Sequence, residues 1–320
     1  MFVNDFMRFT RAHEWHPGKM PLMLAFVSIM FLFSPSPQQN FLWVILAYVL
    51  TSLYLAASYM LNNIADREID KVANKKTGLD GWSRKKLAIP VVIFAALILL
   101  FGIAFLSIPV VIAILGCFIL SWSYHMPPRY KEHVILGPIV PAFAQLPAPA
   151  LVVAVAWGNL PLPALVYLMI MFFYLVRMLF VHHILDYEND KLTGTNTTAT
   201  KLGVPAVLRL VRFTFVIEML CLVVFLALIV HYGFPKLLFI SLAWPLCLLI
   251  LRHIRKEPIR LDSYSYIPLA DIHESVLPLI LAIGVAMREG NMMIAIVPLV
   301  IVLFLRRHFE RLVVPLLGWK

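Results

Sequence analysis

Long apolar segments alternate with short polar segments from one end of the chain to the other. A membrane-spanning helix needs about 20 predominantly apolar residues, and most of these segments come close to that length. The pattern predicts ten spans, at residues 20–35, 41–62, 87–106, 108–124, 134–156, 162–185, 205–230, 236–251, 271–287 and 291–306. We therefore expect an all-α polytopic membrane protein with nine to ten transmembrane helices.

The fifth predicted span carries four prolines, Pro138, Pro141, Pro147 and Pro149. Proline lacks a backbone N–H and clashes with the preceding helical turn. We expect this span to be kinked or partly unwound, which is tolerated at membrane depth only against protein or a cavity. Because no Gly- or Ser-rich linker interrupts the chain, residues 1–320 are interpreted as a single transmembrane domain.

The composition agrees with a membrane protein. Hydrophobic residues make up 62% of the chain and charged residues 14%, whereas soluble domains are about a quarter charged. Cys117, Cys221 and Cys247 lie in apolar segments without paired spacing, which indicates packing rather than disulfides or metal binding. No cleavable signal peptide is evident at the start of the sequence.

The positive charges predict the orientation. With a cytoplasmic N-terminus, 24 of the 27 Lys and Arg residues fall on the cytoplasmic side of the ten spans. Ten spans also return the basic tail, with Arg306, Arg307 and Arg311, to that side. The net charge of +10 therefore favours a membrane surface and argues against nucleic acid as a partner. We expect an integral protein of a bacterial or archaeal plasma membrane with both termini cytoplasmic.

Two acidic motifs stand where predicted spans meet the cytoplasm. After the second span, Asn62, Asp66 and Asp70 recur every four residues, which places them on one face of a helix. After the sixth span, Asp186 and Asp190 repeat this spacing. Carboxylate oxygens suit Mg²⁺, an ion that proteins commonly share with phosphate oxygens. The two motifs predict a magnesium site for a diphosphate whose apolar tail lies between the helices.

Basic residues expected on the same face would contact the phosphate oxygens, namely Lys75, Lys76, Arg129, Lys131 and Lys191. The acidic motifs could instead be solvated charges, or could coordinate an ion in a transporter. Transport is disfavoured because the four Asp residues lie at inner ends of spans, and only Glu218 is an acidic residue near a span's middle.

Three further polar side chains lie in or beside the sixth span. His182 and His183 precede the second acidic motif, but Mg²⁺ rarely takes imidazole ligands, so a metal role is disfavoured. Arg177 lies within the span at a depth similar to that of Glu218 on the next helix. Because an unpaired charge is costly at that depth, we expect these two residues to form an ion pair.

The acidic motifs resemble those of the UbiA superfamily of intramembrane prenyltransferases. Asn62-x-x-x-Asp66-x-x-x-Asp70 is similar to the first signature of this superfamily. Asp186-x-x-x-Asp190-x-x-x-Gly194, followed by Thr198 and Lys201-Leu202-Gly203, is similar to the second. Each motif alone is common, but the pair in these loops is specific.

The resemblance extends to two basic segments and covers the first seven predicted spans in order. Tyr124, Arg129 and Lys131 are similar to the family's tyrosine and basic residues in the loop after span four. Arg11, Trp15 and Lys19 resemble its basic entry segment before span one.

Membership in this superfamily would imply a helical bundle around a central cavity with a lateral opening to membrane lipid. It would also imply Mg²⁺-dependent transfer of an isoprenoid chain from a prenyl diphosphate to a small lipophilic, aromatic or quinone-precursor acceptor. On that basis the Mg²⁺ ligands and catalytic residues would be Asp66, Asp70, Asp186 and Asp190. Asn62 would support the first cluster, and the diphosphate would be contacted by Lys19, Tyr124, Arg129 and Lys131.

The sequence also departs from the family pattern. Asn63 stands where the first signature often has Asp, and Asn74-Lys75-Lys76 replaces a common Arg-Pro. The fifth span lacks the Gly-rich pattern of quinone-pathway members. The same scaffold resembles UbiA-type terpene cyclases and phosphoribosyl transferases that act on polyprenyl phosphate. The acceptor therefore stays open.

Overall fold

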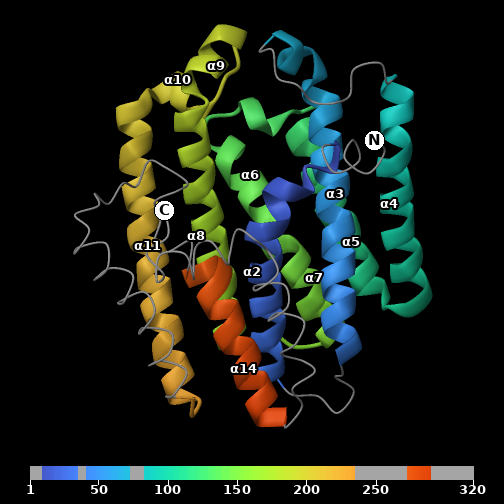
Figure 1. Cartoon of the computed structure of the whole chain (residues 1–320), viewed down its shortest axis with the longest axis vertical. Helices are drawn as coiled ribbons and strands as arrows, with labels where there is room; N and C mark the ends of the chain where they lie inside the picture. The colour runs from blue at the N-terminus through green and yellow to red at the C-terminus, as the bar shows by residue number, and fades with distance from the viewer. Residues whose placement is uncertain (1–8, 35–40, 73–82, 235–271, 290–320) are drawn as a thin grey trace, which may run out of the picture. The chain divides into compact units, whose positions relative to one another are not determined.

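The computed structural model describes residues 9–34, 41–72, 83–234 and 272–289. The regular structure within these ranges is entirely helical, as the apolar pattern predicts (Figure 1). Its helices are α2 (Ala12–Phe33), α3 (Phe41–Val72), α4 (Arg84–Phe105), α5 (Ile108–His125), η1 (Tyr130–Glu132), α6 (Leu136–Gln145), α7 (Pro147–Trp157), α8 (Leu162–Leu185), α9 (Tyr187–Thr193), α10 (Thr198–Leu202), α11 (Val204–His231), η3 (Ile272–Val276) and α14 (Leu277–Glu289).

Seven helical segments within the described ranges are long and apolar enough to cross a membrane. They match the first seven predicted spans. The ninth predicted span coincides with α14, which is 13 residues long and follows the π-helical turn η3. Predicted spans 236–251 and 291–306 lie outside the described residues, so the total of nine to ten helices stays a prediction.

Helices α4 and α5 carry apolar side chains that the protein does not cover. These two helices pack against each other (Figure 1), yet Ile103, Phe105 and Ile108 leave 66%, 74% and 77% of their surface exposed. Apolar surface on this scale is unfavourable in water and favourable in lipid tails. Together with the seven apolar helices, it identifies an integral membrane protein.

The contacts divide the chain into two compact units, each described here by itself. The first, the site unit, comprises Met1–His16, Val49–Gly158 and Phe172–Phe215. The second unit comprises Pro17–Tyr48, Asn159–Met171 and Val216–Lys320.

The predicted kink in the fifth span is confirmed. The span is divided at Leu146 into α6 and α7, and Pro147 is the first residue of α7. Prolines remove donors around this break, so nearby carbonyl groups need partners from elsewhere. Tyr54 of α3 supplies one, since its buried hydroxyl donates to the Ala144 carbonyl oxygen at 2.9 Å. The broken helix is thereby tied to α3 inside the site unit.

Replacing Tyr54 with Phe removes that donor and leaves the Ala144 carbonyl without it in a buried position. A lost buried hydrogen bond of this kind costs about 1–3 kcal/mol, so we expect a lower thermal midpoint in detergent. Tyr232→Phe is the control, because Tyr232 is exposed at the end of α11. Equal midpoints for the two variants would contradict the role given to Tyr54.

The second unit contains a buried acid, Glu218, that is paired with a histidine. The Glu218 carboxylate lies 2.9 Å from Nε2 of His273, and neither side chain is exposed. Pairing removes much of the cost of a carboxylate in an apolar interior. In the site unit, the Arg177 guanidinium lies over the rings of Tyr174 and Phe215. Because Arg177 and Glu218 belong to different units, the pair expected between them stays a prediction.

Candidate active site

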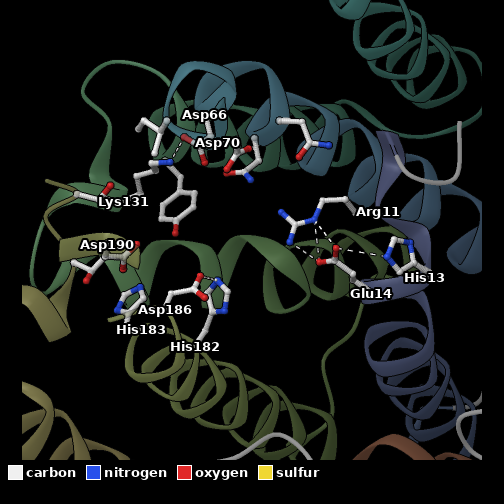
Figure 2. A pocket seen from close by; sticks show the side chains of 16 residues that line it. Arg11, His13, Glu14, Asp66, Asp70, Lys131, His182, His183, Asp186 and Asp190 are labelled. Atoms are coloured by element: carbon white, nitrogen blue, oxygen red, sulfur yellow. Dashed lines mark hydrogen bonds and ion pairs between the residues drawn. The ribbon is translucent and has the colours of Figure 1, made fainter. Parts of the chain in front are cut away.

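A cavity in the site unit collects most of the predicted functional side chains (Figure 2). Its volume is about 540 Å³. It is lined by Arg11, His13, Glu14, Asn62, Asn63, Asp66, Ile69, Asp70, Tyr124, Lys131, His182, His183, Asp186, Asp190, Thr195 and Thr197. The two acidic motifs, about 120 residues apart in the sequence, therefore face one space.

Helix α3 presents the first acidic motif. It continues without a break to Val72, so Asn62, Asp66 and Asp70 follow one another on the same face and all three line the cavity. Figure 2 shows Asp66 and Asp70 on one side of the cavity and Asp186 and Asp190 on the other.

The second motif is placed by a change of helix. Asp186 stands between α8 and α9, where α8 ends at Leu185. Gly194 ends α9 with a φ of +67°, a left-handed conformation that favours glycine. The Thr195 N–H then donates to the Asp190 carbonyl at 2.8 Å, which turns the chain back. Both carboxylates consequently reach the cavity.

Two basic side chains bind the same carboxylate oxygen of the first motif. Arg129 Nη2 donates to Asp66 Oδ1 at 3.1 Å, and Lys131 Nζ donates to the same atom. Burial lowers the pKa of the Lys131 ammonium, and the Asp66 carboxylate opposes that effect. The cavity thus holds a desolvated positive charge beside its acidic wall.

Both arginines near the cavity have unusual backbone conformations. Within the described ranges, Arg11 (φ +50°) and Arg129 (φ +61°) are the non-glycine residues with positive φ. Such conformations are unfavourable for residues with a Cβ and are often held in place at functional sites. Arg129 starts the turn η1, which carries Lys131.

Side chains from the entry segment, residues 9–16, also reach the cavity. The resemblance had singled out Arg11 in this segment, whereas His13 and Glu14 were not predicted. Arg11, His13 and Glu14 line the cavity. Asn63 of α3 holds this segment, since its buried side-chain amide donates to the Phe9 carbonyl at 2.8 Å. An aspartate at position 63 has no such donor. The departure from the family pattern at position 63 therefore supplies the donor, although the sequence does not indicate its partner.

The donor set fits Mg²⁺ shared with a bound phosphate. Four carboxylates and the Asn62 amide offer hard oxygen ligands around one cavity. As they stand, no three His, Cys, Asp or Glu side chains in the described ranges converge enough to hold a metal ion among themselves. Asp66 pairs with Lys131 and Arg129, and Asp186 lies 3.4 Å from His182 Nε2. An ion held by few protein ligands, with phosphate oxygens and water completing its shell, suits this arrangement.

Some predicted residues are not brought into the lining. Arg129 does not line the cavity and reaches it through its bond to Asp66. Lys191 is exposed on α9 and is not part of the lining. Lys19 belongs to the second unit, so its predicted contact with the diphosphate stays a prediction. Lys75 and Lys76 lie outside the described residues.

Gly137 is predicted to be sensitive to substitution because α6 approaches the Lys131 loop closely there. A Cβ at Gly137 would lie 3.0 Å from the Lys131 carbonyl oxygen. We expect Gly137→Ala to shift that loop and to weaken binding of inorganic pyrophosphate with Mg²⁺ on the order of threefold to tenfold. Calorimetry in detergent measures this. Gly116→Ala in α5 is the control, since a Cβ there meets nothing within 4 Å. Equal affinities for the two variants would exclude the effect.

The fold and the cavity define a helical integral membrane protein with acidic and basic groups gathered at one internal site. The comparison with protein families makes this assignment specific. The family model for the UbiA prenyltransferase family matches residues 22–265. The chain belongs to this family, and the resemblance seen in its motifs is confirmed.

Solved structures agree with the fold. A UbiA homolog from Archaeoglobus fulgidus, bound to GPP and Mg²⁺, is 18% identical with a TM-score of 0.64, and the match covers 90% of this chain and 99% of the homolog. The structure of the same homolog bound to DMAPP and Mg²⁺ is 19% identical in sequence with a TM-score of 0.63, and the match has the same coverage. A structure of digeranylgeranylglyceryl phosphate synthase is 16% identical with a TM-score of 0.56, covering 92% of this chain and 98% of that protein. The search of curated protein sequences gave no match.

Proposed function

We propose that the protein transfers an isoprenoid chain from a prenyl diphosphate to a small lipophilic, aromatic or quinone-precursor acceptor within the membrane. One observation carries the proposal: Asp66, Asp70, Asp186 and Asp190 line the same cavity as the buried ammonium of Lys131. Paired acidic clusters with a desolvated cation suit a metal-bound diphosphate. Membership in the UbiA prenyltransferase family supports the reaction class.

In this proposal Asp66, Asp70, Asp186 and Asp190 hold Mg²⁺, and Asn62 supports the first pair. The bound ion supplies positive charge that neutralises the diphosphate as it leaves. The Archaeoglobus fulgidus homolog was solved with Mg²⁺ and either GPP or DMAPP, which supports the same ligand class for this chain.

The chain's own groups have separate roles in this reaction. Lys131 and Arg129 orient the Asp66 carboxylate, and Lys131 donates to phosphate oxygens that reach it. Tyr124 lines the cavity and can donate its hydroxyl hydrogen to the diphosphate. When the bond between C1 of the isoprenoid and the diphosphate oxygen breaks, the electron pair of that bond leaves with the diphosphate. The acceptor then supplies the pair for the new bond to C1 and loses a proton, which the released diphosphate can take up.

The order and placement of the helices support two wider proposals. We propose that residues 1–320 form a single UbiA-like transmembrane domain, since the family match extends over 22–265, across segments of both compact units. We also propose that the cavity and both termini face the cytoplasm of a bacterial or archaeal cell, because the Lys and Arg residues concentrate on that side of the predicted spans.

The experiment is a product analysis with the purified protein in detergent. Radiolabelled geranyl or geranylgeranyl diphosphate and Mg²⁺ are incubated with and without a lipid extract. A labelled product that forms only with the extract supports prenyl transfer. A cyclic hydrocarbon or alcohol formed without the extract would replace the proposal by a terpene cyclase. A parallel incubation contains phosphoribosyl diphosphate and polyprenyl phosphate. Pyrophosphate release in that incubation, with the prenyl diphosphate left intact in the first, would point to a phosphoribosyl transferase.

A further inference from the structure

The entry segment places an ion pair inside the cavity. Arg11 Nε lies 2.9 Å from both carboxylate oxygens of Glu14, and Arg11 Nη2 also donates to Oε2. Both residues belong to the cavity lining. Figure 2 shows the pair at the end of the cavity away from Lys131 and Asp190. Glu14 therefore adds a carboxylate to this space beyond those of the two acidic motifs.

The backbone around Arg11 is held from several directions. The Asn63 amide donates to the Phe9 carbonyl at 2.8 Å, and the indole N–H of Trp15 donates to the Thr10 carbonyl at 2.7 Å. The Arg11 guanidinium also lies over the Tyr59 ring, 5.6 Å from its centre. These contacts hold the left-handed backbone of Arg11. The guanidinium is consequently directed into the cavity by the fold, and its bond to Glu14 is a second, separable contact.

Glu14 occupies one edge of the Arg11 guanidinium, the edge formed by Nε and Nη2. Arginine binds carboxylates and phosphates through the same parallel pairs of N–H groups. We propose that Glu14 is a specificity-determining residue, whose carboxylate competes with the phosphate of an incoming prenyl diphosphate for the Arg11 guanidinium. The inference rests on the proposed function, because it takes the prenyl diphosphate as the ligand of this cavity.

The exposure of the pair makes the exchange feasible. The Arg11 and Glu14 side chains are 31% and 41% exposed, and ion pairs of this kind shift an equilibrium by about fivefold or less. A diphosphate carries more negative charge than a carboxylate and can therefore displace Glu14 from Arg11 with a loss of affinity of about fivefold or less. A ligand without phosphate has nothing to gain from Arg11 and leaves the pair intact. Glu14 therefore lowers the affinity for phosphate-bearing ligands and leaves the affinity for their apolar tail unchanged.

The test compares binding of geranyl S-thiolodiphosphate and geraniol by calorimetry with Mg²⁺ present. In Glu14→Gln, Kd for the diphosphate analogue is expected to fall about threefold to fivefold, while Kd for geraniol stays unchanged. Glu68→Gln is the matched control, since Glu68 is exposed, pairs with Lys71 and Arg84, and is not part of the lining. It removes the same charge from another helix, α3, and should change Kd by less than about twofold.

A double-mutant cycle isolates the competition. In an Arg11→Gln background, adding Glu14→Gln is expected to give no further gain in affinity, because the guanidinium under competition is absent. Unchanged or weaker binding in Glu14→Gln would overturn the inference, and weaker binding would identify Glu14 as an added cation ligand. An equal gain in affinity in Glu68→Gln would also overturn the inference, because it would show that the effect comes from the net charge of the protein. If the unaltered protein bound no diphosphate analogue, the proposed function and this inference would both fail.

Discussion

Pyrophosphate release from geranyl diphosphate is expected to fall by about 10²- to 10³-fold when Asp190 is replaced with Asn. The substitution keeps the size of the side chain and removes the charge that, in our proposal, holds the cation. Asp66→Asn should cause at least the same loss, since it also leaves the Lys131 and Arg129 cations facing a neutral side chain at their shared acceptor. A coupled enzymatic assay for pyrophosphate measures both rates.

The control for these variants lies in the same motif. Glu188 is an exposed acid on α9 and is not part of the cavity lining. Glu188→Gln should therefore release pyrophosphate at close to the unaltered rate. Activity that survived in Asp190→Asn, or that disappeared equally in Glu188→Gln, would show that charge near the cavity matters without a specific cation site.

Lys131→Met is expected to lower the rate of pyrophosphate release about 100-fold, because it removes a desolvated positive charge beside the leaving group. The pH dependence distinguishes this role from a structural one. Burial lowers the pKa of Lys131, so the ammonium loses its proton at a lower pH than an ordinary lysine. Activity that needs the charged form is present below that pKa and is lost as the pH rises through it.

Lys131→Arg separates charge from fold in the same experiment. Arginine stays protonated throughout the accessible pH range, so the alkaline loss of activity should move to higher pH or disappear, even where the maximal rate is lower. An alkaline limb at the same pH in Lys131→Arg and in the unaltered protein would assign that limb to another group.

The helices and the acidic motifs were predictable because their signals are local. A run of about 20 apolar residues defines a span without reference to the rest of the chain. The spacing of Asn62, Asp66 and Asp70 defines a helical face in the same way. The break at Leu146 followed from the prolines of the fifth span, since missing donors act on their own helix.

The entry segment could not be predicted in this way because its contacts join distant parts of the sequence. Asn63 reaches Phe9 across more than 50 residues, and nothing in the spacing of the first motif identifies that partner. The left-handed backbone of Arg11, which directs its side chain, is likewise a product of those contacts. The sequence pattern did not single out Glu14, whereas the structure places it in the cavity lining.

The buried acid Glu218 shows the same limit of local reasoning. Its depth in the seventh span correctly indicates that it needs a partner. Depth alone does not choose among candidates, and the structure places His273, 55 residues later, at 2.9 Å. The pair expected between Glu218 and Arg177 stays a prediction, because the two residues belong to different units.

The central claim is that the carboxylates of α3 and those around the α8–α9 junction hold a divalent cation together with a prenyl diphosphate. The most direct measurement is anomalous diffraction from crystals grown with Mn²⁺ and geranyl S-thiolodiphosphate. The proposal predicts Mn²⁺ bound by Asp66 or Asp70 and by Asp186 or Asp190, with diphosphate oxygens in its coordination shell and the geranyl chain between the helices. Ligand bound in the cavity without Mn²⁺ at these carboxylates, or Mn²⁺ bound only elsewhere, would contradict it.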